Sequence, residues 1–231
     1  SQRLSASRAI VERGAGQDVP TYGINTGFGA FANRKIPAAH LDALQLNLVR
    51  SHAAGVGEAL PPHLTRRLML LKVNSLVTGY SGVRPVLVDA LLAMTNGAVL
   101  RVIPRAGWVG ASGDLAPLAH LALAVIGEGE ARHGEAMLRG ADVLKAAGVA
   151  PVKLSAKEGL ALLNGTQLSA ALAVEGYLQS DNLMRTAIVA GALTVEALAG
   201  SHAPFDARIH EVRGQRGQIE IARRFRRWLT D

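Results

Sequence analysis

The chain has 231 residues and no cysteine, which excludes disulfides, thiolate metal ligands and a cysteine nucleophile. Hydrophobic residues make up 49% of it but aromatic residues only 4%, which favours a globular, mainly α-helical protein with an Ala-, Leu- and Val-rich core. The formal net charge is +7, but the basic residues are scattered along the sequence, so no nucleic-acid partner is expected. No apolar run approaches the roughly 20 residues that span a bilayer. We therefore expect a cytoplasmic protein without a membrane partner.

Apolar spacing between glycine and proline breaks predicts a series of helices. They are expected at residues 2–13, 37–53, 61–78, 85–96, 115–126, 141–147 and 155–164, with a small hairpin formed by 130–132 and 136–138. Ser155 and Glu158 have the spacing of a capping box at the start of the helix near residue 155. Two long apolar helices are expected to fill residues 167–200, where many Ala and Gly residues allow close helix packing.

Residues 110–120 read Gly-Ala-Ser-Gly-Asp-Leu-Ala-Pro-Leu-Ala-His. Small residues allow a tight turn, and Asp114 is predicted to cap the helix that follows. Such a loop at a helix N-terminus lies in a positive field, which suits an anion or an electron-withdrawing group. On these residues alone, an ordinary capped helix start remains the alternative.

Several common kinds of site do not fit the sequence. Ser112 is not in a G-x-S-x-G nucleophile elbow, because Asp114 occupies the last position. The seven histidines are isolated, so no metal site is predicted. Residues 27–32 match a dinucleotide-binding pattern formally, but no hydrophobic strand precedes them. Tyr22 lies at the mouth of this glycine-rich loop and stays a candidate.

The Ala-Ser-Gly tripeptide at 111–113 suggests a different chemistry. The unhindered glycine nitrogen could attack the alanine carbonyl carbon if the loop is compressed. Loss of water from that ring and from the serine side chain would leave an exocyclic methylidene, an electrophile that no ordinary side chain supplies. Spacing alone does not establish this reaction.

Four motifs, in this order, resemble those of the aromatic amino acid ammonia-lyases. They are Tyr-Gly-Ile-Asn-Thr-Gly-Phe-Gly at 22–29, the 110–120 stretch, Leu-Asn-Gly-Thr-Gln at 163–167 and Phe-Asp-Ala-Arg-Ile-His at 205–210. The resemblance implies that Ala111, Ser112 and Gly113 cyclise autocatalytically into 4-methylideneimidazol-5-one (MIO), with Asp114 assisting and no metal or nucleotide required. It also implies an N-terminal domain over residues 1–163 that carries this loop, followed over 164–231 by the start of a fumarase/aspartase-like central helical bundle.

The resemblance also implies roles for single residues. Tyr22 is expected to remove the β-proton of the substrate, and Asn164 to hydrogen-bond the MIO oxygen or the substrate amine. The pair Ser51 and His52 is similar to the selectivity pair of the histidine-specific members, with His52 contacting the imidazole. The expected reaction converts L-histidine to urocanate and ammonia. Alternatives are another MIO-dependent ammonia-lyase or aminomutase, and a non-catalytic assembly module.

The chain also departs from the family pattern. It corresponds to the N-terminal half of family members, whose active sites are built from several subunits of a homotetramer. We therefore expect a fragment that is inactive alone. Trp108 stands where the family usually has a smaller residue, which is expected to reshape the loop before the MIO tripeptide.

Overall fold

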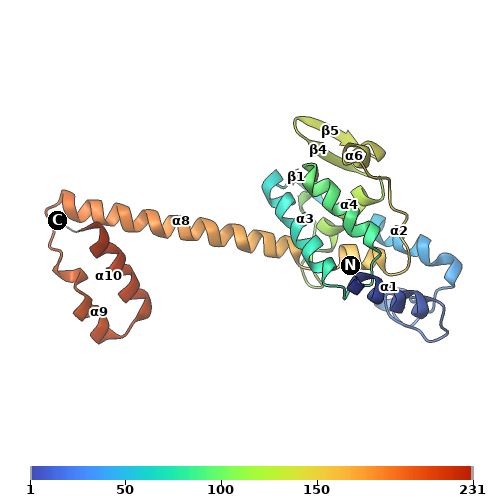
Figure 1. The fold of residues 1–231 in the computed structure, drawn as a ribbon, viewed down its shortest axis with the longest axis horizontal. Coiled ribbons are helices and arrows are strands. Elements are labelled where there is room, and N and C mark those ends of the chain that lie inside the picture. Colours follow the sequence, from blue (N-terminus) through green and yellow to red (C-terminus); the bar gives the residue numbers. More distant parts are fainter. Residues whose placement is uncertain (1, 230–231) are drawn as a thin grey trace. The chain divides into compact units, whose positions relative to one another are not determined.

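The computed structural model describes residues 2–229, and this part is mainly helical (Figure 1). The helices are α1 (Gln2–Ala15), α2 (Leu41–His52), α3 (Pro62–Val77), α4 (Pro85–Asn96), α5 (Leu115–Val125), α6 (Ala141–Ala146), α7 (Glu158–Leu163), α8 (Gln167–Ala197), α9 (Ala207–Arg213) and α10 (Arg216–Trp228), with 3-10 turns at Gly29–Phe31, Ala38–His40 and Ala203–Phe205. The strands are β1 (Val56–Ala59), β2 (Val99–Arg101), β3 (Pro104–Ala106), β4 (Glu130–His133) and β5 (Ala136–Arg139). The predicted mainly α-helical fold is confirmed.

Contacts divide the chain into two units, one ending at Leu172 and the next beginning at Ala173, within α8. The domain division predicted from sequence, between residues 163 and 164, instead coincides with the break between α7 and α8. That division stays a prediction.

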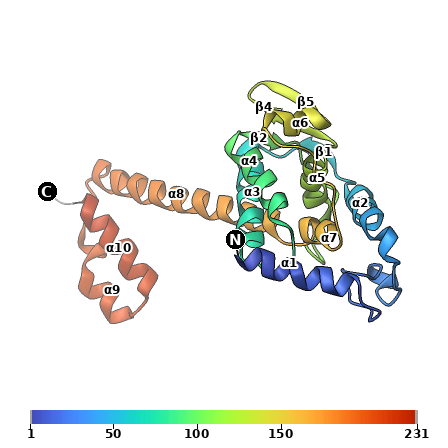
Figure 2. The same ribbon diagram turned by 45° about the vertical axis from the view of Figure 1, so that its right-hand side comes forward.

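Helix α5 lies at the centre of the first unit because all of its side chains except that of His120 are apolar. Its Leu118, Leu121 and Val125 are fully buried. Helix α5 packs against α2 and α7, while α3 packs against α4 (Figure 2). The residues just before α5 are therefore held on a rigid, buried support.

Two small antiparallel sheets complete the first unit. Strands β4 and β5 form the predicted hairpin, and β2 adds to it on the β4 side. Strands β1 and β3 pair separately, with Val56 opposite Ala106 and Ala59 opposite Pro104. Sequence reasoning missed β1 because its four residues are all exposed and show no apolar alternation. This pairing brings the end of α2 beside the segment that leads to residue 110.

Two helix predictions were wrong in detail. Residues 167–197 form one helix rather than two. The stretch contains no proline, and the interior glycines Gly176 and Gly191 cost only about 1 kcal/mol each relative to alanine, too little to break a long helix. Helix α7 begins at Glu158 rather than near residue 155.

The predicted capping box forms only in part. The Glu158 Oε2 accepts a hydrogen bond from the Ser155 backbone N at 2.9 Å. The Ser155 Oγ, however, accepts from Arg8 at 2.9 Å instead of capping the helix. Lys157, between them, has a left-handed backbone with a φ of 71°, so the helical conformation starts only after it.

In the second unit, the arginine-rich tail forms α9 and α10. Phe205 stacks on Phe225 with ring centroids 4.5 Å apart and an interplanar angle of 6°. The Arg226 guanidinium donates to the Phe205 carbonyl at 2.5 Å. A β-carbon on Gly191 would lie 2.8 Å from the Phe225 ring, so this glycine lets the ring pack directly on α8.

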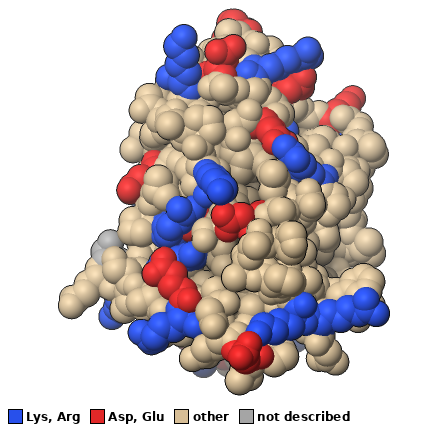
Figure 3. All heavy atoms as spheres, turned by 90° about the vertical axis from the view of Figure 1, so that its right-hand side faces the viewer, with Lys and Arg blue, Asp and Glu red and all other residues tan. Residues whose placement is uncertain are grey.

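Charge is spread rather than gathered on the surface that Figure 3 shows. Lysine and arginine side chains alternate with acidic ones across this face, with wide uncharged areas between them (Figure 3). Within residues 2–229, no helix combines the length and the apolar character needed to cross a membrane.

Candidate active site

The loop before α5 depends on two glycines with backbone angles that other residues rarely adopt. Gly110 has a φ of 74° and Gly113 a φ of 114°. A β-carbon built on Gly113 would lie 2.6 Å from the Gly165 carbonyl oxygen. Gly113 therefore packs backbone to backbone on the segment between α7 and α8, where a larger residue does not fit.

Two hydrogen bonds fasten the loop to that segment. The Asp114 backbone N donates to the Gly165 carbonyl oxygen at 2.7 Å. The Asn164 side-chain Nδ2 donates to the Ser112 carbonyl oxygen at 2.7 Å. The structure thus brings Ser112, Gly113 and Asn164, three of the residues singled out from sequence, into one arrangement.

The Asp114 side chain does not cap α5, so that prediction was wrong. Its carboxylate is fully buried and accepts hydrogen bonds from the Ser169 backbone N at 2.8 Å and the Ser169 Oγ at 2.7 Å. Ser169 lies in the first turn of α8, whose free N–H groups need acceptors. Asp114 begins α5 through its backbone carbonyl, which accepts from Leu118 N at 3.1 Å, while its side chain caps a different helix.

Two helix N-termini therefore border the loop. Helix α5 begins directly after it at Leu115, and α8 begins at Gln167, next to the segment that the loop contacts. Each N-terminus carries a partial positive charge. The loop thus lies in the positive field that its sequence predicted.

A cavity of about 320 Å³ opens beside the loop. Its walls come from the end of α2, the loop and the start of α5, namely Ser51, His52, Ala54, Gly107, Trp108, Val109, Gly110, Ala111, Ser112, Gly113, Leu115 and Ala116. The predicted selectivity pair and the predicted MIO tripeptide thus line the same cavity. Trp108 supplies its aromatic wall and also packs against the hydrophobic core.

The end of α2 fixes the orientation of His52. Its Nδ1 lies 2.9 Å from the Leu48 carbonyl oxygen and 3.2 Å from the Ser51 Oγ. A neutral ring in this position donates from Nδ1 to the carbonyl. The Nε2 atom is then the acceptor that a ligand can use.

Tyr22 is not among the residues that line this cavity. Its side chain is 54% exposed and contacts Phe28 edge to face, with ring centroids 6.0 Å apart. The turn that carries it is held by the fully buried Asn25, whose Nδ2 donates to the carbonyls of Gly14, Gln17 and Val19 at 3.1–3.2 Å. The described chain therefore places Tyr22 on a fixed turn outside the cavity.

Sequence reasoning gave no role to His120, which joins α5 to the segment that follows α2. Its Nε2 accepts a hydrogen bond from the Gly55 backbone N at 3.0 Å, just beyond the predicted selectivity pair. Burial, assisted by the nearby Arg101 guanidinium, lowers the pKa of His120 to about 4. The ring is therefore neutral near pH 7. The only signal in the sequence was a polar residue within the otherwise apolar helix 115–126.

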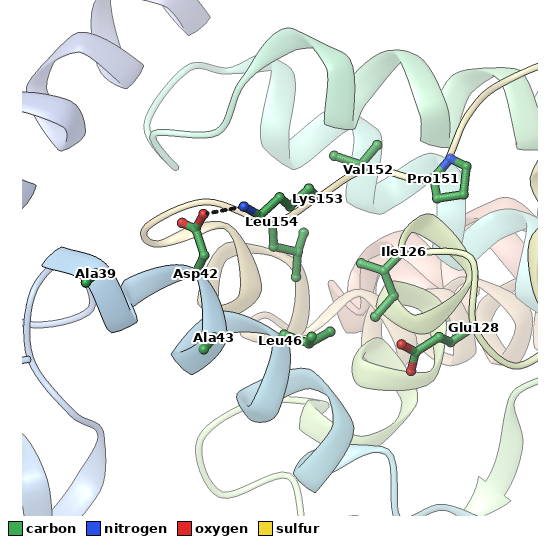
Figure 4. Close-up of a pocket in the computed structure, with 10 residues that line it drawn as sticks. All are labelled: Ala39, Asp42, Ala43, Leu46, Ile126, Glu128, Pro151, Val152, Lys153 and Leu154. Atoms are coloured by element: carbon green, nitrogen blue, oxygen red, sulfur yellow. Dashed lines mark ion pairs between the residues drawn. The ribbon is translucent and has the colours of Figure 1, made fainter.

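A larger hollow of about 570 Å³ lies between the start of α2, the end of α5 and residues 151–154 (Figure 4). Asp42 and Lys153 form an ion pair across its rim at 3.3 Å. None of the residues singled out from sequence lines it. We take the smaller cavity as the candidate site because the predicted MIO tripeptide and the predicted selectivity pair line it. Among residues 2–229, no cluster of three His, Asp or Glu residues could hold a metal ion.

Comparison with known proteins agrees with these features. The profile of the family described as "Aromatic amino acid lyase" matches residues 1–231. The chain belongs to the aromatic amino acid lyase family. A curated relative, "Histidine ammonia-lyase" of Enterobacter sp. (strain 638), is 52% identical over 230 residues, which cover 100% of this chain and 46% of the relative. The chain thus spans less than half the length of the curated relatives it matches.

Solved structures of related lyases and aminomutases share its fold. Histidine ammonia-lyase from Trypanosoma cruzi has a TM-score of 0.90 and 41% identity, over 97% of this chain and 44% of that one. Pantoea agglomerans phenylalanine aminomutase has a TM-score of 0.92 and 35% identity, over 97% of this chain and 43% of that one. The fold is therefore common to lyases and aminomutases, and the substrate has to be argued from the site.

Proposed function

We propose that this chain is the ring-forming half of a histidine ammonia-lyase, which converts L-histidine to urocanate and ammonia. The observation that carries the proposal is the Asn164 Nδ2 on the Ser112 carbonyl oxygen at 2.7 Å. When the Gly113 nitrogen bonds to the Ala111 carbonyl carbon, the Ala111 oxygen leaves as water with the N–H hydrogens of Gly113 and Ser112, and a C=N bond forms to the Ser112 nitrogen. The Ser112 Oγ leaves with the serine α-hydrogen as a second water. The Ser112 carbonyl oxygen is retained, so Asn164 holds the future ring oxygen.

The residues present fit the MIO group. Gly113 brings no side chain that would obstruct attack by its nitrogen, and Ala111 and Ser112 are both exposed in the loop. The ring supplies an electrophile that turns the substrate amino group into a better leaving group. Asn164 would hold the ring oxygen and draw electron density toward it, and Asp114 keeps the loop fixed on α8 through Ser169.

The cavity supports an imidazole substrate. The His52 Nε2 can accept the imidazole N–H, because the Nδ1 atom is engaged by the Leu48 carbonyl. Trp108 offers an aromatic face for a flat ring. The curated relative that is 52% identical is a histidine ammonia-lyase, whereas the phenylalanine aminomutase is 35% identical. These findings favour histidine over the alternative of another MIO-dependent lyase or an aminomutase.

Catalysis is proposed for the whole, assembled protein. Tyr22, the proposed base for the β-proton, lies outside the cavity lining, and no lysine or arginine lines the described cavity to bind a carboxylate. Large apolar side chains on α8, such as Tyr177, Leu183 and Leu193, are 65–71% exposed and could pack in a homotetramer. The chain alone is therefore expected to be inactive.

Two measurements test this proposal. Intact mass is expected to show that the purified chain has lost two waters, whereas an unshifted mass would favour a non-catalytic assembly module. The absorbance of urocanate should not grow when the chain alone is mixed with L-histidine. Clear turnover would contradict the incomplete site proposed for this chain.

A further inference from the structure

A buried lysine, Lys72, contacts the segment that holds the loop and does not line the cavity. Lys72 on α3 is 1% exposed, although Leu64, Leu68 and Leu76 occupy the same row of the helix, four residues apart. Burial lowers the pKa of the Lys72 ammonium to about 7, since an apolar environment penalises the charged form. A buried lysine contributes less to stability than an apolar residue of similar size. A buried lysine that lowers stability is therefore a candidate for a functional role.

The ammonium of Lys72 contacts the segment that fastens the loop. Its Nζ donates to the Asn164 carbonyl oxygen at 3.3 Å. The side chain of the same Asn164 donates to Ser112, and the next carbonyl, that of Gly165, accepts from Asp114 N. Lys72 therefore acts on the peptide group that lies between the two fastening hydrogen bonds.

A second residue of α3 holds the far end of this segment. The Arg67 guanidinium donates to the Ala171 carbonyl oxygen at 3.1 Å, in the early turns of α8. Arg67 and Lys72 thus attach α3 to the backbone on both sides of the break between α7 and α8. Of the two, Lys72 contacts the residue whose side chain reaches the loop.

We propose that Lys72 is a positioning residue that acts through Asn164. By fixing the Asn164 carbonyl, it keeps the Asn164 amide on the Ser112 carbonyl oxygen and thereby speeds ring closure of residues 111–113. The inference rests on the proposed function and adds to it a residue that touches neither the cavity nor the tripeptide.

The test compares the chain with its Lys72→Met and Lys72→Arg variants. Lys157→Met is the matched control, because the Lys157 Nζ also donates to a backbone carbonyl, that of Ser81, at 2.9 Å. Three quantities are measured: the NMR signals of the Asn164 side-chain amide, the rate of two-water loss by intact mass, and the melting temperature.

We expect Lys72→Met to shift the Asn164 amide signals and to slow water loss about tenfold, the effect of losing one hydrogen bond to a charged group. Its melting temperature should not fall, because the variant removes a buried charge. Lys72→Arg should restore the amide signals and most of the rate, and Lys157→Met should change neither.

Unchanged Asn164 signals in Lys72→Met, or equal changes in Lys157→Met, would overturn the proposal. So would a melting temperature that falls in parallel with the rate, since that pattern indicates a purely structural lysine. A wild-type chain without water loss counts against the proposed function of this chain. The Asn164 signals then decide alone, because a shift in Lys72→Met supports the positioning role and no shift overturns it.

Discussion

The Asp114 carboxylate and Ser169 are joined by two hydrogen bonds, from the Ser169 backbone N at 2.8 Å and its Oγ at 2.7 Å. They connect residues 55 positions apart in the sequence, and they make the start of α8 part of the support for the loop. Together with the hydrogen bond from Asn164 to Ser112, they hold the loop against the segment of residues 164–169.

Replacing Asp114 by alanine should lower the free energy of unfolding by about 3 kcal/mol, because the buried Ser169 backbone N loses its acceptor and a charge-assisted hydrogen bond is lost. Ser169→Ala removes only the hydroxyl contact and should cost about 1 kcal/mol. Urea unfolding measures both. Asp181→Ala is the control, since Asp181 forms an i,i+4 ion pair with Arg185 on α8 and should cost less than about 0.5 kcal/mol. Equal losses at Asp114 and Asp181 would contradict this assignment.

The two loop glycines offer a matched comparison. Gly113→Ala places a β-carbon 2.6 Å from the Gly165 carbonyl oxygen in addition to the strain of a φ of 114°. Gly110→Ala adds backbone strain alone, because nothing lies within 4 Å of its β-carbon. We expect the free energy of unfolding to fall by at least about 2 kcal/mol in Gly113→Ala and by about 1 kcal/mol in Gly110→Ala. The loss of two waters should be abolished only in Gly113→Ala. Unfolding and intact mass measure the two effects. A larger effect in Gly110→Ala than in Gly113→Ala would show that the close packing of Gly113 on Gly165 is not what restricts position 113.

His120 should make stability depend on pH. Its pKa is about 4 in the folded chain against 6.5 for a free histidine, so the unfolded state binds a proton more readily between these values. The stabilising contribution is present above about pH 6.5 and is lost as the pH falls toward 4. In His120→Gln this part of the pH dependence should flatten, because the amide oxygen still accepts from Gly55 but does not titrate. His133→Gln, at an exposed position of β4, should keep the wild-type slope. A slope unchanged by His120→Gln would refute the role of this imidazole.

Sequence patterns predicted the helices well where apolar spacing and proline or glycine boundaries agree, as in α3 between Pro62 and Val77. The resemblance to the lyase family singled out Ser51 and His52, and both line the cavity beside the loop, while their role in selectivity stays a prediction. They failed where a side chain serves a distant segment. Asp114 has the spacing of a cap for α5, yet its carboxylate caps α8, more than fifty residues later.

The same limit applies to residues with no local motif. Lys72 interrupts an apolar row of α3, and that interruption is visible in the sequence, but its partner Asn164 becomes apparent only when α3 and the α7–α8 break are placed together. Tyr22 shows the converse, since its motif is clear while the described chain places it outside the cavity. Local periodicity therefore identifies elements and candidate residues, whereas long-range hydrogen bonds decide which of them act together.

Substrate choice should follow the His52 ring. In the active whole protein, His52→Phe removes the Nε2 acceptor and should weaken L-histidine binding about tenfold or more, since a buried polar substrate group loses its partner. Binding of L-phenylalanine should improve relative to L-histidine, because the new side chain presents only an apolar surface. Ser51→Ala is the control: its Oγ contacts Leu48 and the Nδ1 side of the ring, so it should alter affinity less. Calorimetric titration of both amino acids measures the preference, with Ser112→Ala added to every protein so that the ring does not form and the substrate is not consumed. If His52→Phe keeps the wild-type ratio of the two affinities, the imidazole is recognised elsewhere and the assignment of this cavity wall to substrate selection is wrong.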